Sequence, residues 1–221
     1  MPAGRAACVT MFLLVLCSTS VLSAEDVSRR YTETHGQQIS TVEYRVSRTG
    51  GDVEASSTGG DADDAIRWRP GTGTYDWQMS NQKAGTTLHG QRRGDVIHVT
   101  GTLKNRNVDR DVKVDPAPWY QIFGPLIQYL LPEGSAQKEF WVVNPDDLSA
   151  HKMQVKRAGI ERITIRGALV DTLRIHFSPA GALAPFWGAD FWYRQSDGAY
   201  VSSRLPENGG ITVTTIEDPK Q

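Results

Sequence analysis

Histidines and carboxylates are the side chains of this sequence that could hold a metal or transfer a proton. The five histidines are His35, His89, His98, His151 and His176. No pair of them stands at a metal-ligand spacing such as His-x-x-x-His. The sequence also has no Gly-x-Ser-x-Gly nucleophile elbow and no phosphate-binding glycine loop before a helix. We therefore predict no metal, no cofactor and no catalytic residue, and we expect the protein not to be an enzyme.

Acidic residues cluster at 61–64 and at 146–147. A calcium loop needs oxygen ligands at alternate positions and a closing carboxylate, and neither cluster supplies the full set. Glycoside hydrolysis needs two carboxylates roughly 5–9 Å apart in a cleft, which spacing along a β-rich chain cannot test. A hydrolase of a cell-surface polymer therefore stays open as an alternative, with Asp76, Asp146 and Asp190 as carboxylates that could line its cleft.

Aromatic side chains are the most informative residues, because they gather in two places, at 119–129 and at 186–193. Neighbouring residues of a strand point to opposite faces, so Phe191 and Tyr193 cannot share one core with Trp192. We expect the surplus aromatic surface to line an apolar pocket suited to an acyl chain or another hydrophobic ligand. The residues expected to line that pocket are Trp119, Phe123, Leu126, Leu130, Trp187, Phe191 and Tyr193.

The elements that must position these residues are strands around one helix. Apolar and polar residues alternate with period two in many runs, for example 42–47, 75–80 and 173–177, and Gly- or Asn-rich turns separate the runs. The pattern favours roughly ten to twelve antiparallel strands. Residues 119–131 are almost continuously apolar and lie between Pro118 and Pro132, with Gly124-Pro125 as a kink. The fold predicted is mostly β, a large curved antiparallel sheet (an open or half barrel) wrapped around one kinked apolar helix.

The first 24 residues have the pattern of a secretory signal peptide. Arg5 gives a positive start, residues 9–16 are apolar, and small residues follow. We expect cleavage near Ala24 and a periplasmic or secreted protein. Cys17 is not expected to carry a lipid, because Leu16 is a poor residue before a lipidated cysteine. The remaining chain is predicted as a polar arm over 25–36, a single β domain over 37–217 and a tail over 218–221.

Composition bears on partners and on stability. The chain of 221 residues has 24 basic and 25 acidic side chains, a formal net charge of −1. Without a basic surface we expect no nucleic-acid partner. Cleavage of the signal would remove both cysteines, Cys8 and Cys17, so the domain would rely on its core rather than on disulfides. No later apolar run is long enough for a transmembrane helix.

Three features of the second half of the chain occur in a recognisable order. They are the predicted Pro-bounded apolar helix, the strand and turn at 140–147, and the sequence Phe191-Trp192-Tyr193-Arg194-Gln195-Ser196-Asp197-Gly198 before the last strands. In these features the chain resembles a bacterial family of exported proteins of unknown function in the LolA/LolB lipoprotein-carrier-like superfamily. The resemblance implies a curved antiparallel sheet around helices, a periplasmic location and a hydrophobic cavity. It implies no catalytic residues. The single kinked helix is a departure, since the carriers have more helix.

Three functions follow from these patterns. The main hypothesis is a non-enzymatic envelope protein that binds a lipid or other hydrophobic ligand between sheet and helix. The first alternative is a structural module of the cell envelope that binds a protein partner and keeps its aromatic residues fully buried. The second is the hydrolase described above.

Overall fold

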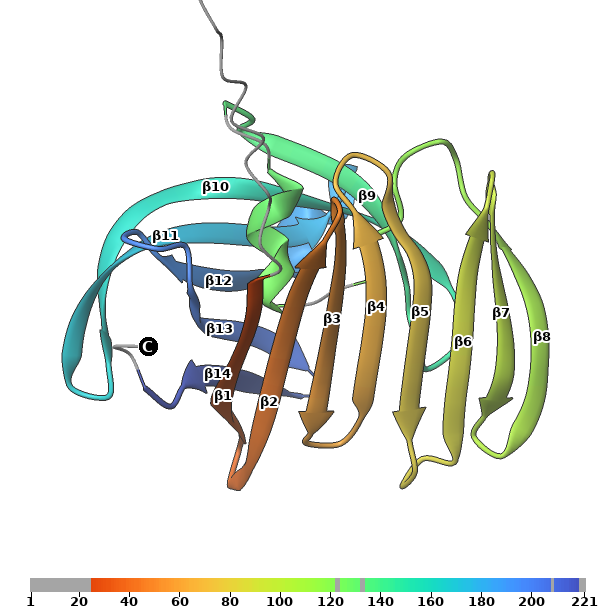
Figure 1. Ribbon diagram of the computed structural model, residues 1–221, viewed down its shortest axis with the longest axis horizontal. Helices are drawn as coiled ribbons and strands as arrows, with labels where there is room; N and C mark the ends of the chain where they lie inside the picture. The colour runs from red at the N-terminus through yellow and green to blue at the C-terminus, as the bar shows by residue number, and fades with distance from the viewer. Residues whose placement is uncertain (1–24, 122–123, 132–133, 208, 219–221) are drawn as a thin grey trace, which may run out of the picture.

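The computed structural model describes residues 25–121, 124–131, 134–207 and 209–218 (Figure 1). The predicted signal peptide and its cleavage site therefore lie outside the described residues. Within the described ranges, no helix is long and apolar enough to cross a membrane.

Fourteen strands form one antiparallel sheet, in the order β8-β7-β6-β5-β4-β3-β2-β1-β14-β13-β12-β11-β10-β9. The first eight strands form one wall of the molecule, and strands β10 to β14 run across them in Figure 1. The first wall consists of β1 (Glu25–His35), β2 (Gln38–Thr49), β3 (Asp52–Gly59), β4 (Asp63–Arg69), β5 (Gly73–Asn81), β6 (Thr86–Arg93), β7 (Val96–Leu103) and β8 (Arg106–Lys113). The second consists of β9 (Gln137–Val143), β10 (Ala150–Ile165), β11 (Ala168–Pro179), β12 (Ala189–Arg194), β13 (Tyr200–Glu207) and β14 (Gly210–Ile216). The predicted fold class, a large curved antiparallel sheet, is confirmed.

Alternation and turn chemistry explain why these segments pair as they do. In β4 the residues Ile66 and Trp68 are buried while their neighbours are exposed, so one face of the strand meets the core. Gly50 and Gly51 join β2 to β3 with φ angles of 59° and 92°. That left-handed conformation suits glycine and matches the twist of a hairpin.

The segment over 25–36, expected from its polarity to be an arm, contains strand β1 in the middle of the sheet. It pairs with β2 on one side and with β14 on the other, which joins the first wall to the second. Tyr31 is only 1% exposed, and its hydroxyl donates to the carbonyl of Tyr200 at 3.0 Å. A strand with one buried tyrosine and many polar residues resembles a loose segment in sequence, and one of its two pairing partners, β14, lies about 180 residues away along the chain.

A second junction draws the two walls together through the segment 118–121. The amide of Thr74 on β5 donates to the carbonyl of Trp119 at 2.6 Å, and the amide of Tyr120 donates to the carbonyl of Trp141 on β9 at 2.9 Å. This crossing segment therefore bridges two strands that lie far apart in the order of the sheet. The curved sheet closes over an interior there.

The predicted apolar helix is shorter than expected. Residues Gly124–Leu130 form a 3₁₀ helix, η1, that lies between the two walls, whereas Trp119 belongs to the extended crossing segment. Backbone groups of the crossing segment form hydrogen bonds with β5 and β9, so the residues of this segment are not helical. A second short 3₁₀ helix, η2 (Gly181–Phe186), joins β11 to β12.

Candidate functional site

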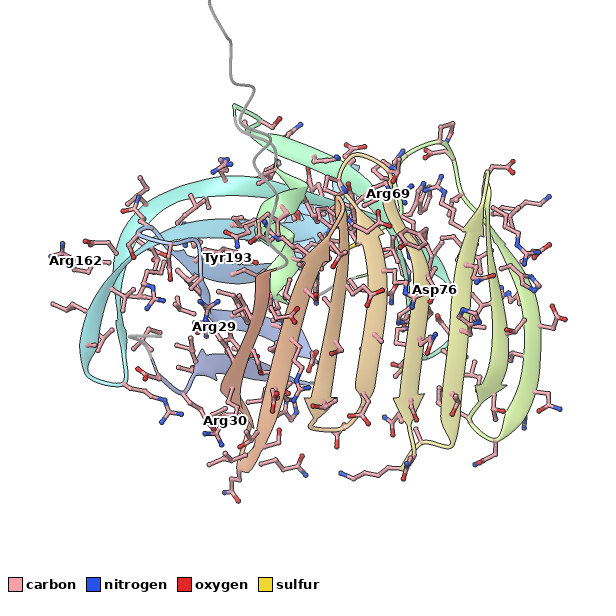
Figure 2. The ribbon with its side chains drawn as sticks, viewed as in Figure 1. Arg29, Arg30, Arg69, Asp76, Arg162 and Tyr193 are labelled. Atoms are coloured by element: carbon pink, nitrogen blue, oxygen red, sulfur yellow. The ribbon has the colours of Figure 1, made fainter. Side chains whose placement is uncertain are left out.

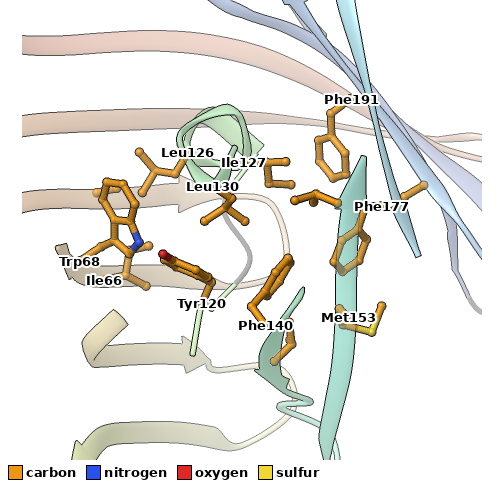
Figure 3. Close-up of a cluster of buried hydrophobic side chains, with 14 of the residues drawn as sticks. Ile66, Trp68, Tyr120, Leu126, Ile127, Leu130, Phe140, Met153, Phe177 and Phe191 are labelled. Carbon is orange, nitrogen blue, oxygen red and sulfur yellow. The ribbon is translucent and has the colours of Figure 1, made fainter. Parts of the chain in front are cut away.

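Helix η1 places three apolar side chains against the inner face of the sheet. Leu126, Ile127 and Leu130 are all buried. Figure 3 shows them among aromatic and aliphatic side chains from strands β4, β9 and β11 and from the crossing segment. We call this space the η1 chamber. Its lining residues are Ile66, Trp68, Tyr120, Gln121, Leu126, Ile127, Leu130, Phe140 and Phe177.

The protein's own side chains fill the η1 chamber. The open space left in it is about 10 Å³, which is room for about one water molecule. Ligand pockets of ordinary size are roughly 300–1,000 Å³. A hydrophobic ligand can therefore occupy this interior only if η1 moves away from the sheet.

Four of the residues predicted to line a pocket face this interior. Leu126 and Leu130 line the η1 chamber itself. Phe191 and Tyr193 lie on β12 with exposures of 2% and 1%, and Phe191 lies beside Ile127 in Figure 3. These residues come from elements more than 60 positions apart and meet only because the sheet bends around η1.

The other predicted lining residues do not touch the η1 chamber as it stands. Trp119 is fully buried, but its ring packs edge-on against Trp77, with 6.4 Å between the ring centroids. Trp187 follows η2 and packs edge-on against Phe177 at 5.5 Å. Phe123 lies outside the described residues. The sequence therefore located the two aromatic groups, although not which members face η1.

Several lining residues were missed by the sequence analysis. Trp68, Tyr120, Phe140 and Phe177 were not among the expected pocket residues, yet they surround η1 (Figure 3). Three of them are inward residues of alternating strands, so the pattern marks them as core. What the pattern lacks is any indication of which strands lie opposite η1.

Few hydrogen bonds hold η1 to the strands. Tyr193, which lies beside η1 in Figure 2, donates from its hydroxyl to the carbonyl of Gly124 at 2.5 Å. The side-chain amide of Gln128 donates to a carbonyl of the β12–β13 turn at 2.6 Å. Arg157 donates to the carbonyl of Leu131 at 3.2 Å. None of these three bonds belongs to a strand ladder.

Three tyrosine rings separate the η1 chamber from a second hollow. Tyr31 lies 5.2 Å from Tyr44 and 5.1 Å from Tyr200, measured between ring centroids. A methyl group added at Gly124 would lie 2.9 Å from a ring carbon of Tyr200, so Tyr200 contacts η1 directly. Burial raises the pKa of all three hydroxyls far above its ordinary value, which keeps this wall uncharged.

The second hollow, which we call the polar groove, is an open space of about 910 Å³ on the far side of the tyrosine wall. Strands β1 to β4 supply most of its lining, together with the ends of β13 and β14. Its ionisable residues are Glu33, His35, Tyr44, Asp61, Asp64, Lys83 and Glu207. Carboxylates outnumber cations there, and Lys83 already pairs with Asp61 at 2.9 Å.

Two carboxyl groups that line the polar groove, those of Glu33 and Asp64, are partly buried. Burial raises the pKa of Glu33, although hydrogen bonds from Thr214 and Tyr44 oppose the shift. Burial likewise raises the pKa of Asp64, which accepts a hydrogen bond from the Trp77 indole at 3.0 Å. Carboxyl groups with raised pKa values are suited to proton transfer. The sequence analysis missed this group because its members come from separate hairpins.

The carboxylates named for a hydrolase cleft do not line the polar groove. Asp76 accepts hydrogen bonds from His89 at 2.9 Å and from Gln91 at 3.1 Å. Asp190 accepts one from His176 at 2.9 Å, and Asp146 lies in the turn after β9. Across the described ranges, no group of three or more His, Cys, Asp or Glu side chains is placed to hold a metal ion.

The fold and the site together define a class: a strongly curved, open antiparallel sheet whose interior is plugged by a short apolar helix. No protein-family model matches the sequence, and no match is found among curated proteins. Among solved structures, it is similar to a β-barrel-like protein of the domain of unknown function DUF1849 from Brucella abortus. That match has 8% identity and a TM-score of 0.48, and it covers 86% of this chain and 95% of the other.

A second similar structure is the hypothetical lipoprotein YmcC from Escherichia coli, with 13% identity, a TM-score of 0.38 and coverage of 87% of each chain. Both scores lie below 0.5, so neither structure carries an argument about function. Neither is described as a member of the LolA/LolB-like superfamily, and that resemblance stays a prediction.

Proposed function

We propose that the protein is a non-enzymatic binder of a lipid or other hydrophobic ligand, exported to the periplasm, which holds the ligand in the interior that η1 now fills. One observation carries the proposal. Helix η1, which is not part of the sheet, covers the inner face of the sheet with the apolar side chains of Leu126, Ile127 and Leu130. An acyl chain would cover the same face in the same way. The proposed export of the protein rests on the signal-peptide pattern of residues 1–24.

The attachment of η1 supports its displacement. A 3₁₀ helix has poorer hydrogen-bond geometry than an α-helix, and the tethers to Gly124, Gln128 and Leu131 are isolated bonds. Segments with few supporting bonds open more readily than the sheet that surrounds them. Once η1 is displaced, the aromatic rings of Trp68 and Phe140, among others, become the walls of a binding site.

Uptake of a ligand is the direct test. The protein is purified gently and its mass measured under native conditions, then it is titrated with a neutral fluorescent hydrophobic probe such as N-phenylnaphthylamine. We expect copurified lipid or saturable binding of the probe. A clean apo mass together with no uptake at any probe concentration would refute the proposal.

A second candidate function rests on the polar groove. A groove with several carboxylates, two of them partly buried, is what a hydrolase of a cell-surface polymer needs, with Glu33 as the proton donor. In that case the protein releases reducing ends from cell-wall polysaccharide, and Glu33→Gln abolishes the release. Absence of activity against a panel of such polymers removes this candidate without touching the first.

A protein partner in the cell envelope stays a prediction. The surface to examine is η2, where Leu183 and Phe186 are 64% and 82% exposed in a segment without charged residues. Pull-down of one defined envelope protein by the wild type, lost in a Leu183→Ser, Phe186→Ser variant, would support it.

A further inference from the structure

One polar atom of the η1 chamber lacks a full hydrogen bond. The indole nitrogen of Trp68 is buried and reaches no acceptor among the described residues at full hydrogen-bond distance, although it acts weakly on the Tyr120 hydroxyl and opposes the burial that raises the pKa of that group. Figure 3 shows it turned toward the hydroxyl of Tyr120 in the same chamber. A buried donor left unpaired is unfavourable, so such groups are rare and often belong to a binding site.

Tyr120 adds a second donor at the same place. Its hydroxyl accepts a hydrogen bond from Lys138 at 3.3 Å, and within the described ranges its own hydrogen has no acceptor. Burial raises the pKa of Tyr120, so the hydroxyl keeps that hydrogen at neutral pH. The Trp68 N–H therefore faces the Tyr120 oxygen without a full hydrogen bond, and within the described ranges the Tyr120 O–H has no acceptor, so one incoming acceptor could satisfy both donors.

Lys138 brings a positive charge to this pair of donors. Its ammonium lies 5.4 Å from the centre of the Tyr120 ring and, along the described chain, pairs with no carboxylate. Lys138 is only partly exposed, and this partial burial lowers its pKa. Arg48 stacks on Tyr129 of η1 at 4.2 Å, so the surroundings of η1 are basic whereas the polar groove is acidic.

From this arrangement we infer that the ligand is a fatty acid whose carboxylate accepts hydrogen bonds from Trp68 and Tyr120 and pairs with Lys138, while its chain replaces η1. The inference rests on the proposed function. A planar carboxylate can accept hydrogen bonds from both donors and pair with the cation. The open space beside these groups is small, which favours a small headgroup. An alcohol or ester of the same length can accept a hydrogen bond there, but it has no charge to pair with Lys138.

Binding of three ligands with the same chain separates the headgroup from the chain. Purified protein that retains the N-phenylnaphthylamine probe is titrated with oleate, oleyl alcohol and methyl oleate, each below its aggregation concentration. We expect oleate to displace the probe with an affinity at least about tenfold higher than the other two, because hydrogen bonds to a charged group are worth about a factor of ten or more.

Three variants locate the effect. Lys138→Met, Tyr120→Phe and Trp68→Phe should each reduce the preference for oleate over oleyl alcohol about tenfold and leave binding of the alcohol nearly unchanged. Lys138 is partly exposed on β9, so its variant is expected to fold even if the tryptophan variant does not. Matched controls are Lys83→Met in the polar groove and Trp192→Phe, whose indole bonds to Glu161 on the opposite face.

The outcomes are distinct. If no probe or lipid binds, the proposed function fails. If all three ligands bind equally and the variants change nothing, the function stands and the fatty-acid inference is wrong, with the two donors serving a single buried water. If oleate is preferred but the control variants lose the preference equally, the carboxylate binds elsewhere and the inference is also wrong.

Discussion

Leu130→Ala tests whether η1 is a displaceable plug. Leu130 is 4% exposed in the closed η1 chamber, and it would be solvated in the open state whatever its size. Truncation therefore weakens only the closed state. Leu→Ala changes in cores cost about 2–5 kcal/mol, and we take about 2–3 kcal/mol because a segment outside the sheet can settle into part of the gap. A free-energy change of about 1.4 kcal/mol alters an equilibrium constant about tenfold, so the population of the state with η1 displaced rises about 30- to 150-fold.

Hydrogen exchange and probe binding measure this change independently. The amides of residues 126–131 should exchange about 30- to 150-fold faster in Leu130→Ala, while strand amides keep the rates set by global stability. The apparent affinity for the neutral probe should rise by the same factor, as long as the open state remains a minor one.

Leu88→Ala is the matched control. Leu88 lies on β6, is 1% exposed and does not line the η1 chamber. Its truncation should lower the free energy of unfolding by about 2–5 kcal/mol, with no selective exchange at η1 and no gain in affinity. Equal behaviour of the two variants in both assays would refute the displaceable plug.

Three further variants probe the polar groove and the packing beside the site. Glu33→Gln should be more stable than the wild type at pH 7.5 and equal to it below about pH 4. Burial raises the pKa of Glu33, so the wild type loses stability as pH rises through that raised value. A lower urea midpoint for the variant than for the wild type at pH 7.5 would contradict this reasoning. Asp115→Asn should be less stable than the wild type at pH 7, a difference that disappears as pH falls toward 2, because Lys152 and two other donors lower the pKa of Asp115 to about 2. A midpoint difference that is independent of pH would count against that ion pair. Gly90→Ala should destabilise the fold by about 1–3 kcal/mol, because the added methyl would lie 2.9 Å from the Trp77 ring; an unchanged melting temperature would show that the ring can move.

Most of the fold could be predicted from local patterns. Runs such as 42–47 and 173–177 alternate strictly, and they lie within β2 and β11. Trp192 was expected to face away from Phe191 and Tyr193, and its indole does bond to Glu161 on the opposite face. Alternation is a property of a few consecutive residues, so it is visible without knowledge of the partner strand.

Pairing over long distances could not be predicted in the same way. The pairing of β1 with β14 places it in the middle of the sheet, and the crossing segment 118–121 is extended because β5 and β9 take its hydrogen bonds. An apolar run bounded by prolines favours a helix locally, and tertiary hydrogen bonds outweighed that preference. The polar groove likewise forms only where strands β1 to β4 meet the ends of β13 and β14, which are far away in the sequence.

The sequence by itself determined the antiparallel β class, the inward phase of its clearly alternating runs and the concentration of aromatic residues in two segments. The tertiary structure decided that η1 fills the interior, and that Trp68, Tyr120 and Lys138 meet beside it. The physical reason is one of range. Side-chain direction in a strand follows from its own backbone geometry, whereas the neighbours of a residue follow from the curvature and closure of the whole sheet.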